Sequence, residues 1–198
     1  MRVWQINKIT RPGRELVHPK LYKPKSETIN MALAKYLRKA WKKPDKQALR
    51  KRMIDWRKSD AVVKVEKPLR LDRARALGYK AKKGIIVLRV RVKRGGHKKP
   101  RPNKGRRSKR LTIRKNLSMN YKQIAEQRAA RKYKNMEVLN SYWIGKDGIH
   151  YFYEVILVDR DKPEIKNDKQ LSFITKSPRG RIFRGLTSTA KKARGLRL

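Results

Sequence analysis

Hydrophobic positions recur along this chain with two different periods, and the period separates predicted helices from predicted strands. Between Met31 and about Lys43 the apolar residues fall every three or four positions, on one helical face: Leu33, Tyr36, Leu37, Ala40 and Trp41. Pro44 should end this helix, and Asp45 is placed to cap a second one. The apolar face of the second helix comprises Leu49, Met53 and Trp56. Lysine and arginine fill the other faces, so these helices are expected to lie on nucleic acid, to pack on the core, or to do both.

The next segments predict a strand, a short helix and a longer strand. Ala61–Glu66 is rich in β-branched residues, which favours a strand, and Leu71–Leu77 predicts a helix ended by Gly78 at its C′ position. Ile85–Lys93 is the clearest strand of the chain. Its alternation places Ile86, Leu88, Val90 and Val92 on one face and Ile85, Val87, Arg89, Arg91 and Lys93 on the other.

A helix and a hairpin follow. Ser118 or Asn120 should cap a helix running to about residue 134, with its core face formed by Ile124, Ala125 and Ala129. Glu137–Ile144 and Ile149–Val158 then predict two strands joined by a turn at 145–148. Both strands are apolar almost throughout, so we expect helices to cover at least one of their faces.

These elements predict an α+β fold, in the order β-α-β-α-β-β after two helices. We expect a small, mostly antiparallel sheet packed with helices, carrying a long basic loop and a C-terminal arm. The expected organisation is a basic N-terminal extension over 1–30, a domain over 31–178 with a basic loop at 94–115, and a basic arm over 179–198.

Charge identifies the expected kind of partner. The chain has 198 residues with 58 Lys plus Arg against 15 Asp plus Glu, a formal charge of +43. Compact folding works against such repulsion, so a polyanion is the expected partner. The 53 residues from Arg73 to Ala125 contain no acid and 20 basic residues, and the last twenty residues contain no acid and 7. Met136–Asp161, with 5 acids against two basic residues, is the expected folded core.

The densest basic run lies between Arg89 and Lys115, with 14 basic residues and no acid. Glycines and prolines interrupt it at Gly95, Gly96, Pro100, Pro102 and Gly105. Such a segment cannot bury surface by itself, so we expect 94–115 to be disordered in the free protein and ordered on RNA.

Three basic segments supply the expected RNA-binding residues, which would displace counterions from phosphates and, for arginine, also stack on bases. The first comprises Arg73, Arg75, Tyr79, Lys80, Lys82 and Lys83. The second comprises Arg89, Arg91, Lys93, Arg94, His97, Lys98, Lys99, Arg101, Lys104, Arg106, Arg107, Lys109, Arg110, Arg114 and Lys115. The third, beside a short helix capped by Thr187 or Ser188, comprises Arg179, Arg181, Arg184, Lys191, Lys192 and Arg194.

Catalytic and metal-binding patterns are missing from the sequence. The chain has no cysteine, its three histidines are far apart, and it has neither a phosphate-binding loop nor a nucleophile elbow. Asp159, Asp161 and Glu164 resemble a solvated surface turn more than a metal site. We therefore expect no enzyme activity, no cofactor, no metal and no small-molecule substrate. No apolar run approaches the roughly 18 residues of a membrane span, so a cytoplasmic protein without a membrane partner is expected.

The four tryptophans allow two interpretations. Trp4, Trp41, Trp56 and Trp143 could stack on nucleic-acid bases or pack in the core. Tryptophan on an apolar helix face or in an apolar hairpin more often packs in the core. For Trp143 in particular we predict a core position rather than base stacking.

Four segments, in this order, carry a family resemblance: Leu71–Lys82, Arg89–Pro100, Val138–Gly145 and Arg184–Ser188. Together they resemble the e-type family of ribosomal protein fifteen from the archaeal and eukaryotic large subunit, over about residues 31–198. The resemblance implies a structural protein that binds large-subunit ribosomal RNA and lies beside other large-subunit ribosomal proteins. It also implies that RNA contacts include Arg89, Arg91, Arg94, Lys98 and Arg101.

The N-terminus departs from this family, whose members begin at a segment matching Met31–Tyr36. Thirty residues with a net charge of +5 precede it here. Translation from Met31 and a genuine extra arm are both compatible with these residues, and we favour the first. The basic composition, together with few asparagines and glutamines and no cysteine, is typical of a thermophile, so an archaeal source is a hypothesis.

Two other classes of protein explain the sequence less well than a ribosomal role does. An architectural DNA-binding protein does not need an acid-free loop between a strand and a helix. A membrane-surface protein would use basic amphipathic helices such as Ala32–Lys43, but leaves the rest of the chain unexplained.

Overall fold

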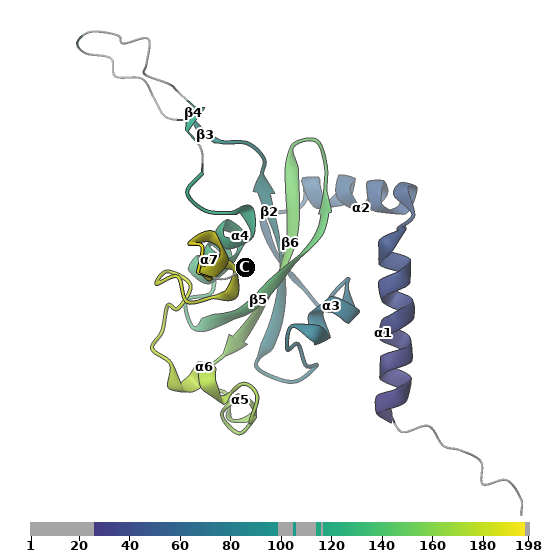
Figure 1. Cartoon of the computed structure of the whole chain (residues 1–198), viewed down its shortest axis with the longest axis vertical. Coiled ribbons are helices and arrows are strands. Elements are labelled where there is room, and N and C mark those ends of the chain that lie inside the picture. Colours follow the sequence, from purple (N-terminus) through teal and green to yellow (C-terminus); the bar gives the residue numbers. More distant parts are fainter. Residues whose placement is uncertain (1–25, 99–104, 106–113, 116, 197–198) are drawn as a thin grey trace, which may run out of the picture.

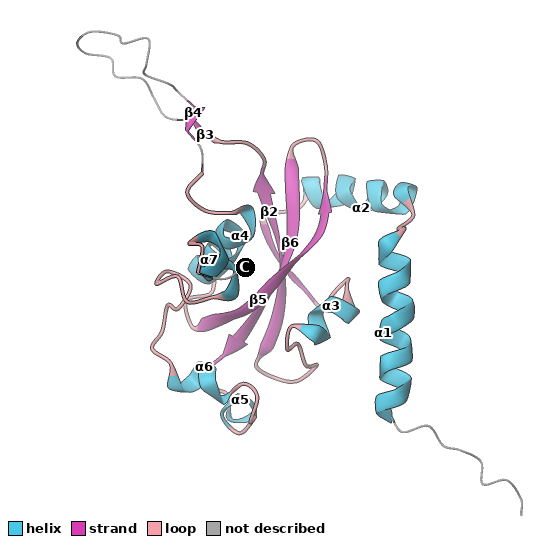
Figure 2. Cartoon of the chain, in the orientation of Figure 1, coloured by secondary structure: helices cyan, strands magenta, loops and turns pink. Residues whose placement is uncertain are grey.

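The computed structural model describes residues 26–98, 105, 114–115 and 117–196 (Figure 1). Four antiparallel strands form the central sheet in the order β1-β2-β6-β5 (Figure 2). They are β1 (Val62–Val65), β2 (Ile85–Lys93), β5 (Met136–Lys146) and β6 (His150–Asp159). The α+β prediction is confirmed, and so is the order of its elements. The expected disorder of 94–115 falls mostly outside the described residues.

One face of the sheet is covered by α4 (Tyr121–Lys132) and α7 (Ser188–Ala193), which lie together on the left in Figure 1. Asn120 caps α4, because its side chain accepts a hydrogen bond from the Gln123 amide at 2.8 Å. The buried residues of this face come from both strands and helix: Leu88, Val90, Val92, Val155, Leu157, Ala125 and Ala129. The predicted apolar face of β2 is therefore the face under α4.

The opposite face is covered by α2 (Lys46–Lys58) and α3 (Leu71–Ala76). Asp45 caps α2, accepting from the Gln47 amide at 2.9 Å. Trp56 of α2 packs edge-on against Phe152, with ring centroids 5.2 Å apart. The structure thus buries both faces, which is why the hairpin strands are apolar almost throughout.

Gly78 ends α3 in the left-handed conformation, at φ +95°. The Gly78 amide donates to the Arg75 carbonyl at 3.1 Å, and the Tyr79 amide donates to the Ala74 carbonyl at 3.0 Å. This pair of bonds is the Schellman motif predicted by a glycine at C′. It turns the chain into the basic segment 79–83.

Helix α1 (Ser26–Lys42) is the outermost element and packs on α3 (Figure 1). It begins five residues before Met31, the predicted start, because no proline or glycine interrupts the chain after Pro24.

Two small helices, α5 (Pro163–Lys166) and α6 (Ser172–Lys176), follow β6 and cover the end of the sheet opposite the basic loop (Figure 1). They bury Ile165 and Ile174 against Val158. The chain then returns to α4, and Ile182 is buried in the same core cluster as Val138. Residues of the predicted basic C-terminal arm therefore pack against the domain.

Two details of the hairpin differ from the prediction. Strand β5 continues through Gly145 to Lys146, so the turn is shorter than 145–148. Gly145 lies in the strand beneath α2, where an added Cβ would make ordinary contact with Met53 and Trp56 at 3.6 Å. The predicted core position of Trp143 is wrong, since this side chain is 41% exposed. It lies on β5, an edge strand whose outer side no further strand covers.

Candidate RNA-binding surface

Several carboxylates of the described residues are turned into the protein. Asp72, Glu126, Glu137 and Glu154 are all buried. Glu154 accepts the Leu69 amide at 3.1 Å, and burial raises its pKa. A buried carboxylate that is satisfied inside the fold contributes little negative charge to the surface. The positive charge of the lysines and arginines on the surface is therefore neutralised less by neighbouring carboxylates.

The first predicted segment divides into structural and exposed residues. Lys80 and Lys82 both donate to Asp168, the former at 2.9 Å, and these bonds hold the pKa of Asp168 well below its usual range. Tyr79 packs against the core cluster beneath α2 and α3. Arg73 and Lys83 are exposed, as is Arg75, which has a partner within the protein.

The arginines of β2 are also used inside the fold. Arg89 is half-buried, lies 5.3 Å above the Trp56 ring and donates to the Ser59 hydroxyl at 3.2 Å. Burial lowers its pKa, and the facing Glu154 partly opposes this shift. Arg91 donates to the Arg57 carbonyl. These side chains hold α2 on the sheet, whereas Lys93 at the end of the strand is exposed.

The base of the basic loop is fixed at three places. Arg94 donates to the Asp147 carbonyl at 3.0 Å and lies 5.2 Å above the Tyr151 ring. The Gly95 amide donates to the Tyr121 hydroxyl at 2.8 Å. Beyond this point β3 (His97–Lys98) pairs with β4 (Arg114–Lys115). The loop therefore leaves from a defined position beside α4 and the hairpin.

The other predicted contacts of this loop lie outside the described residues: Lys99, Arg101, Lys104, Arg106, Arg107, Lys109 and Arg110.

The third segment also contains both kinds of residue. Arg181 is half-buried, lies 5.4 Å above the Phe173 ring, and has a pKa lowered by burial. Arg184 donates to the Pro178 carbonyl at 2.8 Å, which stabilises the preceding turn. Thr187 caps α7 by accepting from the Ala190 amide at 3.3 Å. The exposed cations of the segment are Arg179, Arg184, Lys191, Lys192 and Arg194.

The structure adds cations that the predicted site left out. Along α1 and its junction with α2, a basic groove is lined by Lys35, Arg38, Lys39, Lys42 and Lys43. On α4, Arg128, Arg131 and Lys132 lie toward solvent. Helical spacing already predicted basic faces for α1 and α2, but the absence of acids between Arg73 and Ala125 favoured the loop instead.

Comparison with known protein families identifies the family of this chain. A family model described as Ribosomal L15, of the L15e type, matches residues 32–198. The chain belongs to the ribosomal L15e family. L15e proteins are structural proteins of the large ribosomal subunit, so this chain is not an enzyme, and its family implies ribosomal RNA and ribosomal proteins as partners.

No described helix is long and apolar enough to cross a membrane. The described residues also contain no group of three or more potential metal ligands.

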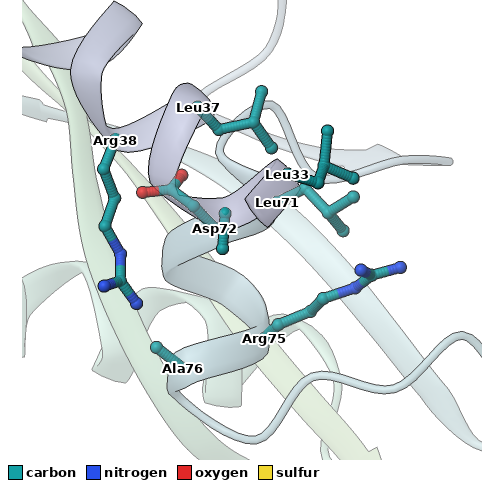
Figure 3. A pocket seen from close by; sticks show the side chains of 8 residues that line it. Leu33, Leu37, Arg38, Leu71, Asp72, Arg75 and Ala76 are labelled. Carbon is teal, nitrogen blue, oxygen red and sulfur yellow. The ribbon is translucent and has the colours of Figure 1, made fainter. Parts of the chain in front are cut away.

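A concavity of about 220 Å³ lies between α1 and α3 of this family member (Figure 3). Leu33, Leu37 and Leu71 supply its apolar wall, and Asp72 also lines it. The Asp72 carboxylate pairs with Arg70 at 3.8 Å and belongs to the first turn of α3, where a negative charge stabilises the helix dipole. The geometry is that of a helix contact.

Proposed function

We propose that this chain binds and stabilises folded large-subunit ribosomal RNA by neutralising its phosphates with basic segments. The observation that carries the proposal is the division of charge across the surface. Carboxylates such as Glu126, Glu137 and Glu154 accept hydrogen bonds inside the protein, while most cations of the described residues lie outside. An excess of exposed cations with few carboxylates beside them is the electrostatic footprint of a nucleic-acid-binding protein.

The internal contacts separate two roles among the predicted residues. Lys80, Lys82, Arg89, Arg91 and Arg181 are engaged by groups of the protein and position its elements. Phosphate contacts are assigned to exposed cations: Arg73, Lys83, Lys93, Arg179, Lys191, Lys192 and Arg194. The loop residues between positions 98 and 114 are assigned to RNA from their sequence.

Salt dependence tests this proposal, because each neutralised phosphate releases counterions. If about 10 phosphates are contacted, the logarithm of the association constant should fall by about 7 to 9 per tenfold rise in salt. The measurement is binding of the full chain to deproteinised large-subunit ribosomal RNA at several salt concentrations. A slope shallower than about −3 would contradict phosphate neutralisation as the main source of affinity.

Two matched double variants test the division of roles. K191Q/K192Q removes two exposed charges, and we expect the slope to become shallower by about two. K80Q/K82Q removes the same charge but also the partners of Asp168, so it should lower stability and change the slope by less than one. Equal slope changes in both variants would contradict the assignment.

Competition distinguishes the alternative partners. Equal retention on duplex DNA and ribosomal RNA would favour an architectural DNA-binding protein. Binding to anionic vesicles in the presence of excess RNA would favour a membrane surface. We expect ribosomal RNA to displace both competitors.

A further inference from the structure

A second concavity lies where the C-terminal segment returns to α4. Its volume is about 390 Å³, within the roughly 300–1,000 Å³ typical of small-molecule sites. Ala130 and Met136 form part of its inner wall, and Phe183 forms its outer wall. Part of its lining, from Arg179 to Phe183, belongs to the predicted basic C-terminal arm.

The position of Phe183 is set by its neighbours. Ile182 is buried in the core, whereas the Phe183 side chain is 52% exposed. Gly180 begins the turn at φ +74°, and its amide donates to the buried Glu137 carboxylate at 2.6 Å. The Phe183 amide in turn donates to the Gly180 carbonyl at 3.0 Å. These hydrogen bonds fix the turn from Gly180 to Phe183, and the turn holds the aromatic ring at the surface.

Cations surround this exposed ring. The Arg131 guanidinium lies over one face of the Phe183 ring, 5.8 Å from its centre, and Lys134 and Arg179 also line the pocket. The Arg179 pair with Asp161 is exposed on both sides, at 3.3 Å, so it is weak enough to be exchanged for a phosphate. An aromatic face rimmed by cations is the arrangement that binds unstacked nucleotides, by stacking and by phosphate neutralisation.

We propose that this pocket holds one unstacked base of the ribosomal RNA, stacked on Phe183, with Arg131, Lys134 and Arg179 on the flanking phosphates. The inference rests on the proposed function and adds to it a site at which a base, rather than the backbone alone, is bound. The rim charge favours RNA over an apolar segment of another protein, because an apolar partner would supply no anion to Arg131 and Lys134.

The first test compares F183L with F173L, measured as affinity of the full chain for deproteinised large-subunit ribosomal RNA. Phe173 is a matched control, since it is 46% exposed and also lies beneath an arginine but does not line the pocket. F183L should weaken binding about 5- to 150-fold, the worth of one stacked base, while F173L should leave it unchanged. F183W keeps an aromatic face and should restore affinity. Equal affinities of F183L and the unsubstituted chain would overturn the site.

Salt dependence separates this site from the wider proposal. Because stacking is not ionic, F183L should keep the steep slope of the unsubstituted chain, whereas R131Q should make it shallower by about one. If the unsubstituted chain has a steep slope and F183L loses no affinity, the base site is rejected but the proposed function is not. A shallow slope of the unsubstituted chain would reject the proposed function itself.

Cross-linking identifies the occupant directly. A photoreactive p-benzoylphenylalanine in place of Phe183, in the full chain assembled into large subunits, should cross-link to a single region of the ribosomal RNA. Cross-links to a ribosomal protein and none to RNA would instead identify the pocket as a protein contact and overturn the proposal.

Discussion

The carboxylate of Glu126 accepts a hydrogen bond from the hydroxyl of Thr187, 3.0 Å away and 61 residues later in the chain. It also accepts the Thr189 hydroxyl at 2.9 Å and the hydroxyl of Ser141 on β5. Glu126 is fully buried, so α4, the sheet and the C-terminal helix meet at one carboxylate. This contact, with the burial of Ile182, keeps the basic C-terminal segment on the domain.

Replacing Glu126 with glutamine should release that segment. The amide has one acceptor oxygen in place of two, so at least one buried hydroxyl loses the acceptor for its O–H, at a cost of about 1–3 kcal/mol. Chemical denaturation should show the loss of stability, and hydrogen exchange should show it concentrated in α7. T189V removes a single donor and should cost less. An unchanged unfolding midpoint in E126Q would mean that the carboxylate does not hold α7.

Asp168 should make stability depend on acidic pH. Its pKa is held low in the folded protein by Lys80 and Lys82, whereas an unfolded aspartate titrates near 3.9. The stabilisation is therefore complete above the unfolded pKa and is lost as the pH falls below about 4 toward the folded value. Because both lysines are partly exposed, we expect only ~1 kcal/mol at neutral pH.

D168N tests this, with denaturation measured at pH 7 and pH 3. The variant should be less stable than the unsubstituted protein at pH 7, and the difference should shrink at pH 3. A difference of the same size at both values would point to lost packing rather than to the ion pairs.

Gly145 should limit the size of the residue beneath α2. A Cβ there would make ordinary contact with Met53 and Trp56, at 3.6 Å, so G145A should change stability little. G145L has no space and should cost about 1–3 kcal/mol by displacing α2. G148L is the control, because nothing lies within 4 Å of a Cβ at Gly148. Thermal unfolding of the three variants decides whether this close approach matters.

Deleting residues 1–30 should leave folding and RNA binding nearly unchanged. The deletion removes +5 of the formal charge of +43 and the first turn of α1, but keeps Leu33 and Leu37, which line the contact with α3. Deleting residues 1–42 removes that contact as well and should lower the unfolding midpoint. Loss of assembly into large subunits with the shorter deletion would show that the first thirty residues have an RNA contact of their own.

The sequence determined the elements of this protein because local rules are sufficient for them. The Asp45 and Asn120 caps, the glycine C-cap at Gly78 and the alternation of β2 each depend on a few neighbouring residues. The α+β class followed from their order, and the excess of basic residues identified a polyanionic partner. Four ordered segments indicated the family.

Only the tertiary structure decided which of the charges are available. Lys80 and Lys82 meet Asp168 some 86 to 88 residues later, and Arg89 faces Glu154 across two strands. No local pattern predicts such pairs, because they form only when the sheet brings distant segments together. The same reason applies to Trp143, which local composition assigned to the core and the tertiary structure leaves exposed. It applies also to Phe183, whose pocket forms only when the last basic segment folds back onto α4.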